Sequence, residues 1–140
     1  MKKISVLSVL ALVAVSYAAK TQVPHTVEEV KPYIEQAMSI QERKNKLDVQ
    51  LDDNTIQPTQ AIEETKKLQA ELKGITPPWE FVQYHKTLVE FFEKKQGQYE
   101  LMRKGLPVPQ DFSDTLRDLA KESIRELMIA MGKLDKDVDQ

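Results

Sequence analysis

Apolar residues recur at spacings of three and four throughout the chain after residue 18, and no long stretch alternates apolar with polar residues. The first spacing places side chains on one face of an α-helix, whereas a half-buried strand needs strict alternation. Prolines, glycines and short polar runs divide this part of the chain into four periodic segments. The sequence therefore predicts an all-α protein without strands.

The first predicted helix has a clear beginning. Thr26 and Glu29 have the Thr-x-x-Glu spacing of a capping box, in which each side chain satisfies a backbone donor at the other residue. The periodic segment continues to about residue 53. Pro32 lies past the first turn and lacks a backbone donor, so we expect the helix either to bend there or to begin near Pro32.

Three further helices are expected at about 58–73, at about 76–105 and at about 111–134, because prolines precede or open them and glycines follow the first two. Connections of only a few residues favour an up-down antiparallel bundle of four helices. The helix at 58–73 is shorter than its neighbours. An arrangement of three helices, with this short one folded onto a long hairpin, is the alternative.

The apolar stripes predict which faces are buried. On the third helix the stripe covers about half the circumference, so we expect the first half of this helix to be central in the bundle. On the first helix the expected core residues are Val27, Val30, Ile34, Ala37 and Met38. On the fourth they are Leu116, Leu119, Ala120, Ile124, Leu127, Met131 and Leu134.

The N-terminal segment has the three-part pattern of a secretory signal. Lys2 and Lys3 precede an apolar run at 4–15, and Ser16-Tyr17-Ala18 places small residues where signal peptidase requires them. The run of about 12 residues is shorter than the roughly 20 that span a bilayer, which disfavours the alternative of an uncleaved anchor. We expect a signal peptide at 1–18, cleaved after Ala18, and a single domain at 19–140 with frayed ends at about 19–25 and 135–140.

Charge and cysteine content exclude several classes of function. Residues 19–140 carry 18 basic and 22 acidic residues, a formal charge of −4, and no basic cluster. This balance argues against nucleic acid and against tight binding to anionic lipid. With no cysteine, the chain can form no disulfide and cannot be a lipid-anchored lipoprotein. We expect a periplasmic or secreted protein without a stable membrane anchor after cleavage, stabilised by packing alone; a eukaryotic secreted protein is an alternative.

His85 is the most distinctive polar residue of the predicted core, because it lies in the middle of the third helix's apolar stripe. One interpretation is a haem or metal ligand, paired with a methionine such as Met38, Met102, Met128 or Met131. The favoured interpretation is a structural histidine hydrogen-bonded to a carboxylate or a backbone carbonyl. The chain has no Cys-x-x-Cys-His motif and no paired Glu-x-x-His turns. We therefore expect no cofactor and no metal.

A polar row interrupts the second half of the first helix. Its members are Gln41, Asn45, Asp48 and Asp52. In an up-down bundle this row lies level with Lys95 on the third helix. One interpretation is a polar cavity or a partner-binding cleft; the favoured one is an end of the bundle that is open to solvent, because buried charges need full pairing.

Trp79 is an apolar residue at the start of the third helix, opposite its aromatic stripe. It is a candidate anchor for a protein partner, or it packs under the loop between the second and third helices.

No serine lies in a strand-turn-helix elbow, and the chain has no thiol, so we expect no enzyme. The leading hypothesis is a protein-binding module of the adaptor, chaperone-like or immunity type. A ligand-carrying bundle built around His85 is the second hypothesis, and an enzyme of unrecognised type is the third.

Overall fold

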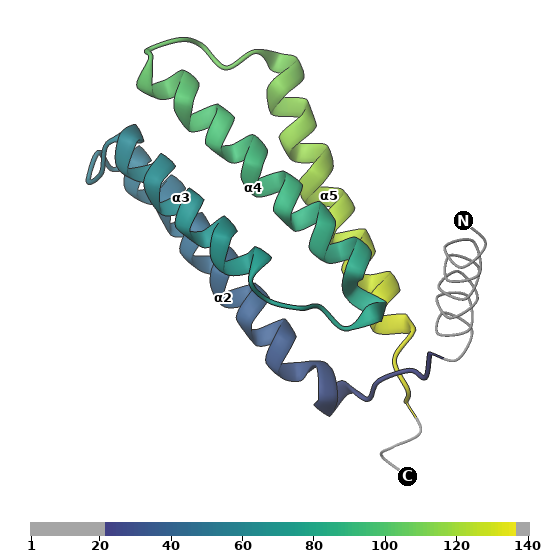
Figure 1. Ribbon diagram of the computed structural model, residues 1–140. Coiled ribbons are helices and arrows are strands. Elements are labelled where there is room, and N and C mark those ends of the chain that lie inside the picture. The colour runs from purple at the N-terminus through teal and green to yellow at the C-terminus, as the bar shows by residue number, and fades with distance from the viewer. Residues whose placement is uncertain (1–21, 137–140) are drawn as a thin grey trace, which may run out of the picture.

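The computed structural model describes residues 22–136. They form four α-helices and one turn of 3-10 helix, and the helices pack into an antiparallel bundle (Figure 1). The elements are α2 (Val27–Asp52), α3 (Pro58–Lys73), η1 (Trp79–Phe81), α4 (Val82–Arg103) and α5 (Gln110–Gly132). The described part of the chain contains four α-helices and no strand, so the all-α prediction and the four-helix count are confirmed. The alternative arrangement of three helices is not confirmed.

The helix ends follow from local chemistry. The side chain of Thr26 accepts a hydrogen bond from the backbone of Glu29, whose own side chain accepts from the backbone of Thr26. The predicted capping box is therefore present. Pro32 lies inside α2 and does not mark its start. After α4, Gly105 adopts a positive φ of 68°, a backbone conformation that favours glycine and that turns the chain towards α5.

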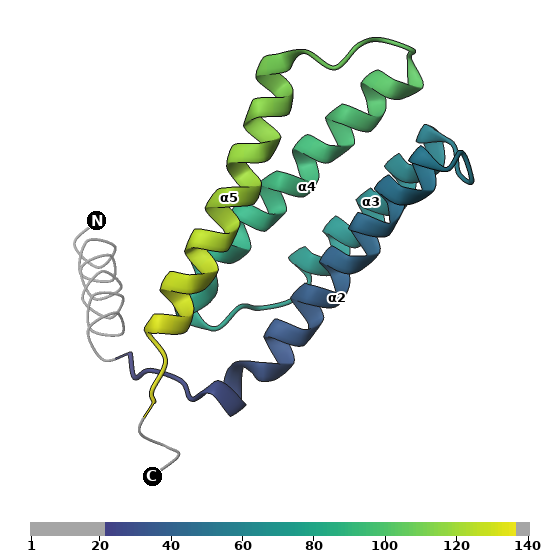
Figure 2. The ribbon, with the colours of Figure 1, turned by 180° about the vertical axis from the view of Figure 1, so that it is seen from behind.

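α4 is the central helix of the bundle, as its wide apolar stripe predicts. It packs against α3 on one side and α5 on the other, while α2 packs mainly on α3. The backbones of α2 and α5 do not approach each other, although these helices flank the same face of the bundle (Figure 2). One side of the bundle is therefore open.

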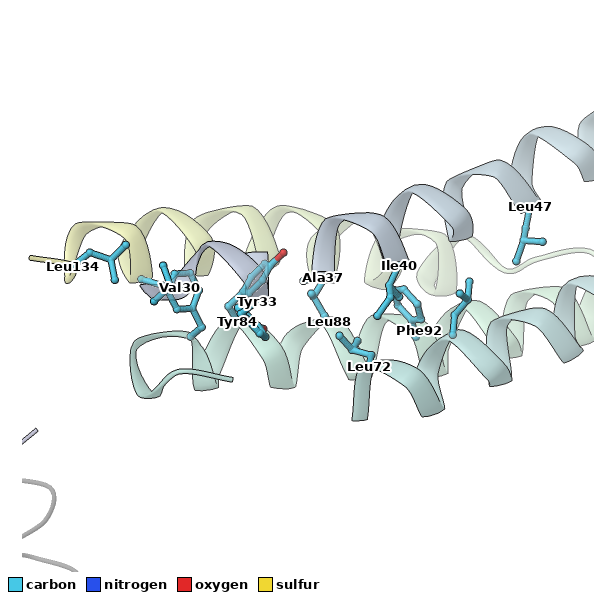
Figure 3. Packing of buried hydrophobic residues seen from close by; sticks show 13 residues of the cluster. Val30, Tyr33, Ala37, Ile40, Leu47, Leu72, Tyr84, Leu88, Phe92 and Leu134 are labelled. Carbon is cyan, nitrogen blue, oxygen red and sulfur yellow. The ribbon is translucent and has the colours of Figure 1, made fainter. Parts of the chain in front are cut away.

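The core lies where α2, α3 and α4 meet, with one end of α5 closing it (Figure 3). Phe92 is fully buried at its centre, and Ile40 and Leu72 reach towards it from α2 and α3. The rings of Tyr33 and Phe81 lie 5.5 Å apart between centroids. Such aromatic pairs stabilise the fold beyond the apolar area that they bury.

The buried face of α2 differs from the expected one. Its buried residues are Val30, Tyr33, Ala37, Ile40, Lys44 and Leu47, again at spacings of three and four. Val27 and Met38 are 47% and 49% exposed. The expected stripe is wrong for these two residues, because α3 and α4 cover the face centred on Tyr33 and Ile40 and leave the adjoining apolar flank open.

The apolar stripe of α5 is also only partly covered. Leu116 and Leu134 are buried, whereas Leu119, Leu127 and Met131 are half-buried. Ile124, expected in the core, is 60% exposed, so that expectation is wrong. The physical reason is the missing neighbour: α2 does not reach across to cover this side of α5.

The segment before α2 is held by hydrogen bonds. His25 donates from its backbone to Glu80 Oε2 at 2.7 Å, and its own carbonyl accepts from the backbone of Asp135 at 2.9 Å. Trp79 Nε1 donates to the carbonyl of Val23 at 3.1 Å. Val23, His25 and Asp135, in the ends expected to fray, are thus tied to η1 or to each other. The predicted signal peptide and residues 19–21 and 137–140 lie outside the described residues.

Within residues 22–136, no helix has the length and hydropathy needed to cross a membrane.

Candidate functional site

Two hollows lie along the open side of the bundle, between α2 and α5. The first, called here the apolar groove, has a volume of about 500 Å³, and the second, called here the charged pocket, has about 250 Å³. The apolar groove is lined by Val27, Leu127, Met128, Met131, Gly132, Leu134 and Lys136. The charged pocket is lined by Lys44, Asp48, Phe91, Lys95, Gln98, Ser113, Leu116, Arg117 and Ala120.

The apolar groove lies at the end of the bundle where α2 begins and α5 ends. Met128 on its α5 side is 70% exposed, and Val27 on its α2 side is 47% exposed. Leu127 and Met131 are half-buried between them. Apolar side chains gain by leaving water, so this hollow favours an apolar occupant. Methionine at such a surface adapts its shape to different partners.

The charged pocket contains an ion pair between α2 and α4. Lys95 Nζ lies 2.8 Å from Asp48 Oδ1 and 2.6 Å from Gln98 Oε1. Tyr99 donates its hydroxyl to the same Asp48 oxygen at 2.5 Å. Burial raises the pKa of the Tyr99 hydroxyl, and the Asp48 carboxylate beside it raises this pKa further. The charge of Lys95, a buried residue, is therefore compensated within the protein.

Lys44 is the second buried lysine of this pocket, and its ammonium is not paired. It is 6% exposed, and Nζ lies 4.3 Å above the centre of the Phe91 ring. No hydrogen bond or ion pair joins Lys44 Nζ to any residue that the structure describes. Burial and the nearby Lys95 ammonium lower the pKa of Lys44 to about 8, against the opposing effect of Asp48. The side chain is thus mostly charged at neutral pH.

The α5 side of the charged pocket supplies the remaining polar groups. The guanidinium of Arg117 pairs with Asp114, one turn earlier on the same helix. Ser113 presents its side chain in the first turns of α5, where backbone N–H groups give the helix end a partial positive charge. Leu116 and Ala120 form an apolar wall opposite Phe91. The pocket therefore combines net positive charge with apolar walls.

The polar row predicted on α2 does not act as one site. Asn45 and Asp52 are exposed, and only Gln41 and Asp48 are half-buried. Gln41 donates to the hydroxyl of Tyr84 at 2.7 Å. Asp48 joins Lys95, at the level expected for parallel first and third helices. The row is thus partly solvated and partly bonded to α4.

His85 is buried, at 8% exposure, and its ring is engaged by protein groups. The hydroxyl of Tyr33 lies 2.9 Å from Nδ1. Burial lowers the pKa of His85 below its ordinary value, against the opposing effect of a hydrogen bond with the backbone of Leu72. Among residues 22–136 no carboxylate bonds with this ring, and the hydrogen-bonding groups are the phenol of Tyr33 and the backbone of Leu72. Residues 22–136 contain no group of three or more His, Cys, Asp or Glu side chains arranged to hold a metal ion.

Trp79 is half-buried and bonds the segment before α2, so its indole holds the chain's own backbone. Beside it, the carboxylate of Glu80 has no exposed surface and lies 2.8 Å from Nδ1 of His25. Although burial acts to raise it, hydrogen bonds from the backbone and ring of His25 hold the pKa of Glu80 below its ordinary range.

A further hollow lies between α2 and α3, with a volume of about 470 Å³. Arg43 and Glu71 on its two sides form an ion pair at 2.7 Å, and both side chains are about half exposed. The two charges of this pair are therefore balanced by each other. Glu35 is the remaining charged residue of the lining.

Sequence reasoning missed Lys44 and Glu80. The signal for Lys44 was present, because it lies four residues after Ile40 and three before Leu47, in step with the core stripe. A charged residue at such a position is usually assigned to the surface. No comparable signal marks Glu80, whose burial depends on His25, 55 positions away in the sequence.

No protein-family model, curated protein or solved structure matches this chain.

Proposed function

We propose that the protein is a non-enzymatic protein-binding module, and that it binds an amphipathic helix of its partner in the apolar groove. The observation that carries this proposal is the open side of the bundle, where α5 leaves Ile124 and Met128 60% and 70% exposed. A surface that collects large apolar side chains from two helices marks an interaction site more often than isolated exposed residues do.

The spacing of the exposed and half-buried apolar side chains of α5 indicates a helical occupant. Ile124, Leu127 (or Met128) and Met131 recur along α5 at three- and four-residue intervals. A second helix packs on this spacing, because side chains three and four positions apart lie on one helix face. Val27 stands on the opposite side of the groove. A helix between α2 and α5 would thus fill the position that the bundle leaves open, in the helix-in-groove mode of recognition.

The proposal includes export. The two-lysine start, short apolar run and Ser16-Tyr17-Ala18 support cleavage after Ala18 and a place in the periplasm or outside the cell. Mass spectrometry of the protein from its source cells should find a chain that begins at Ala19. A membrane-bound chain that retains Met1 contradicts the export proposal.

Site-specific photocrosslinking in the source cells tests the binding proposal. A photoreactive residue replaces Met128 in the groove in one variant and Val27 on its other side in a second; a third variant carries it at the exposed Glu63 of α3. We expect the first two variants to crosslink to the same protein and the Glu63 variant to give no such adduct. Equal crosslinking from all three positions, or none from either groove position, contradicts the proposal.

A matched substitution tests the apolar character of the contact. Met128→Lys places a charge in the groove, whereas Lys121→Met changes an exposed residue of α5 outside the two hollows. We expect Met128→Lys to abolish the crosslink from the Val27 position, because burying an unpaired ammonium is costly. The same crosslink should persist in the Lys121→Met variant.

A further inference from the structure

The charged pocket contains a single positive charge that the protein does not compensate. The charge of Lys95 is balanced by Asp48, and that of Arg117 by Asp114. Among the residues described, Lys44 Nζ has the face of the Phe91 ring at 4.3 Å and no ion pair of its own, and the attraction of Asp48 is shared with Lys95. No fully buried side-chain nitrogen among the described residues lacks a hydrogen-bond partner, so Lys44 Nζ keeps some contact with solvent in the pocket. Most of its hydration is nevertheless lost, since the residue is only 6% exposed, and an aromatic face replaces only part of what is lost.

We propose that the charged pocket is a binding site for a small organic monocarboxylate, whose carboxylate group pairs with Lys44. The proposal goes beyond the helix-binding function, because the pocket and the apolar groove share no lining residue. The two sites lie along the same open side of the bundle, but each is tested without the other.

The charge of the pocket selects a monoanion. With the Lys95–Asp48 and Arg117–Asp114 pairs each neutral, one carboxylate balances Lys44, whereas a phosphate dianion leaves excess negative charge beside Asp48. The ammonium of Lys44 supplies a charge-assisted hydrogen bond to the carboxylate, and these are stronger than hydrogen bonds between neutral groups. The hydroxyl of Ser113 is a further donor on the α5 side.

The walls of the pocket select an organic body. Phe91 contributes its ring from α4, and Leu116 and Ala120 contribute aliphatic side chains from α5. The volume of about 250 Å³ holds a chain of a few carbon atoms beside the carboxylate. A free inorganic anion leaves these apolar walls in water and gains nothing from them.

Butanoate is the probe for this site. Titration into protein with ¹³C-labelled lysine is followed by the Lys44 side-chain resonance, with butan-1-ol as an uncharged probe of the same length and inorganic phosphate as an anion without an apolar body. We expect saturable binding of butanoate, weaker binding of phosphate and no binding of butan-1-ol. Binding should also raise the pKa of Lys44 above its value of about 8 in the free protein, since a bound anion favours the charged amine.

Binding should weaken as the pH rises through the free-protein pKa of Lys44, because only the charged amine attracts the anion. The other charged groups that face this amine are Asp48 on α2, Lys95 on α4 and Arg117 with Asp114 on α5. Lys95 and Arg117 are each paired with a carboxylate, whereas Lys44 has no such pair among the described residues. The lost affinity is therefore assigned to Lys44.

Two lysine variants decide between this site and unspecific attraction. Lys44→Met keeps an apolar chain against Phe91, so we expect the variant to fold, which circular dichroism checks. We expect it to bind butanoate about tenfold more weakly than the wild-type protein, because a charged hydrogen bond is lost. Lys94→Met removes an exposed lysine from α4 and should leave the affinity unchanged. Unchanged affinity in Lys44→Met, or no saturable binding by the wild-type protein, overturns the proposal. Tighter binding of phosphate than of butanoate overturns the assignment to a monocarboxylate.

Discussion

The hydroxyl of Tyr33 lies 2.9 Å from Nδ1 of His85, and this contact joins α2 to α4 inside the core. Both residues are buried, with 5% and 8% of their surfaces exposed. Burial acts on both groups in the same sense: it favours the neutral phenol by raising its pKa and the neutral imidazole by lowering its pKa. The pair is thus a neutral hydrogen bond that specifies how the two helices face each other.

His85→Leu should destabilise the fold by about 1 to 3 kcal/mol, because it leaves the buried hydroxyl of Tyr33 without an acceptor. Adding Tyr33→Phe to this variant removes the orphaned hydroxyl and should recover part of the loss. Urea denaturation of the two single variants and the double variant measures the coupling. Additive losses in the double variant contradict the assigned hydrogen bond.

His85 also predicts a dependence of stability on pH. Its folded pKa is depressed below the ordinary value of 6.5. Below pH 6.5 the unfolded chain therefore binds a proton that the folded protein does not, and the free energy of unfolding falls until the pH passes the folded pKa. Denaturant titrations of the wild-type protein and His85→Leu across this interval check the sign. The variant should lose less stability on acidification than the wild type.

Phe92→Ala should cost about 3 to 5 kcal/mol, because Phe92 is fully buried where α2, α3 and α4 meet. Glu63→Ala, on the exposed face of α3, should change stability by less than about 0.5 kcal/mol. Thermal or urea denaturation followed by circular dichroism at 222 nm compares the two variants. Similar losses at both positions contradict the assigned faces.

Asp48→Ala should destabilise the fold by about 1 to 3 kcal/mol, because Lys95 and Tyr99 lose their shared acceptor and Lys95 stays buried. Asp52→Ala, one turn further along α2, is the matched control. Asp52 is exposed, and its substitution should change stability by less than about 0.5 kcal/mol. Denaturation curves of the two variants at neutral pH give the comparison. An equal effect of the two substitutions refutes a special role for the buried pair.

The attachment of the segment before α2 to η1 should depend on pH, because Glu80 accepts the hydrogen bonds that hold it. Hydrogen bonds from His25 overcome the effect of burial and hold the folded pKa of Glu80 below its ordinary value of 4.5. The stability that this carboxylate contributes is therefore complete above about pH 4.5 and is lost as the pH falls through the folded pKa. Hydrogen exchange at the His25 and Asp135 amides, which this contact orders, measures the loss.

Glu80→Gln removes the titrating group and keeps an oxygen acceptor. We expect the protection of the His25 and Asp135 amides, relative to their intrinsic exchange rates at each pH, to be lower than in the wild-type protein at neutral pH, and its decrease on acidification to be smaller. Exchange at the Phe92 amide, within α4, should change little at neutral pH and serves as the internal control. Unchanged exchange at His25 contradicts the role given to Glu80.

Much of the fold was predictable from the sequence. Thr26 and Glu29 begin α2 as their spacing predicts, and α3 spans Pro58–Lys73 as expected. The wide apolar stripe of the third helix correctly makes it the central one. These features depend on residues within a few positions of each other. Local spacing and capping chemistry therefore determine them without knowledge of the rest of the chain.

The site was not predictable in the same way. Lys44 has the spacing of a core residue and the charge of a surface residue. Only the ring of Phe91 and the attraction of Asp48 explain how it is buried beside a second lysine, Lys95. The polar row of α2 is divided for a similar reason: Asp48 bonds with Lys95 of α4, whereas Asn45 and Asp52 remain exposed. Each of these outcomes depends on which helix lies opposite.

The sequence by itself determined that the chain forms four helices, where most of them begin and end, and that each has an apolar face; the third helix, expected from about 76, begins only at Val82, after η1. The tertiary structure alone decided how those faces are turned, that α2 and α5 stay apart, and that Glu80 meets His25 across 55 positions of sequence. The physical reason is that a helical period is set by backbone geometry, which is local. The burial of a side chain depends instead on neighbours that only the packing of distant segments supplies.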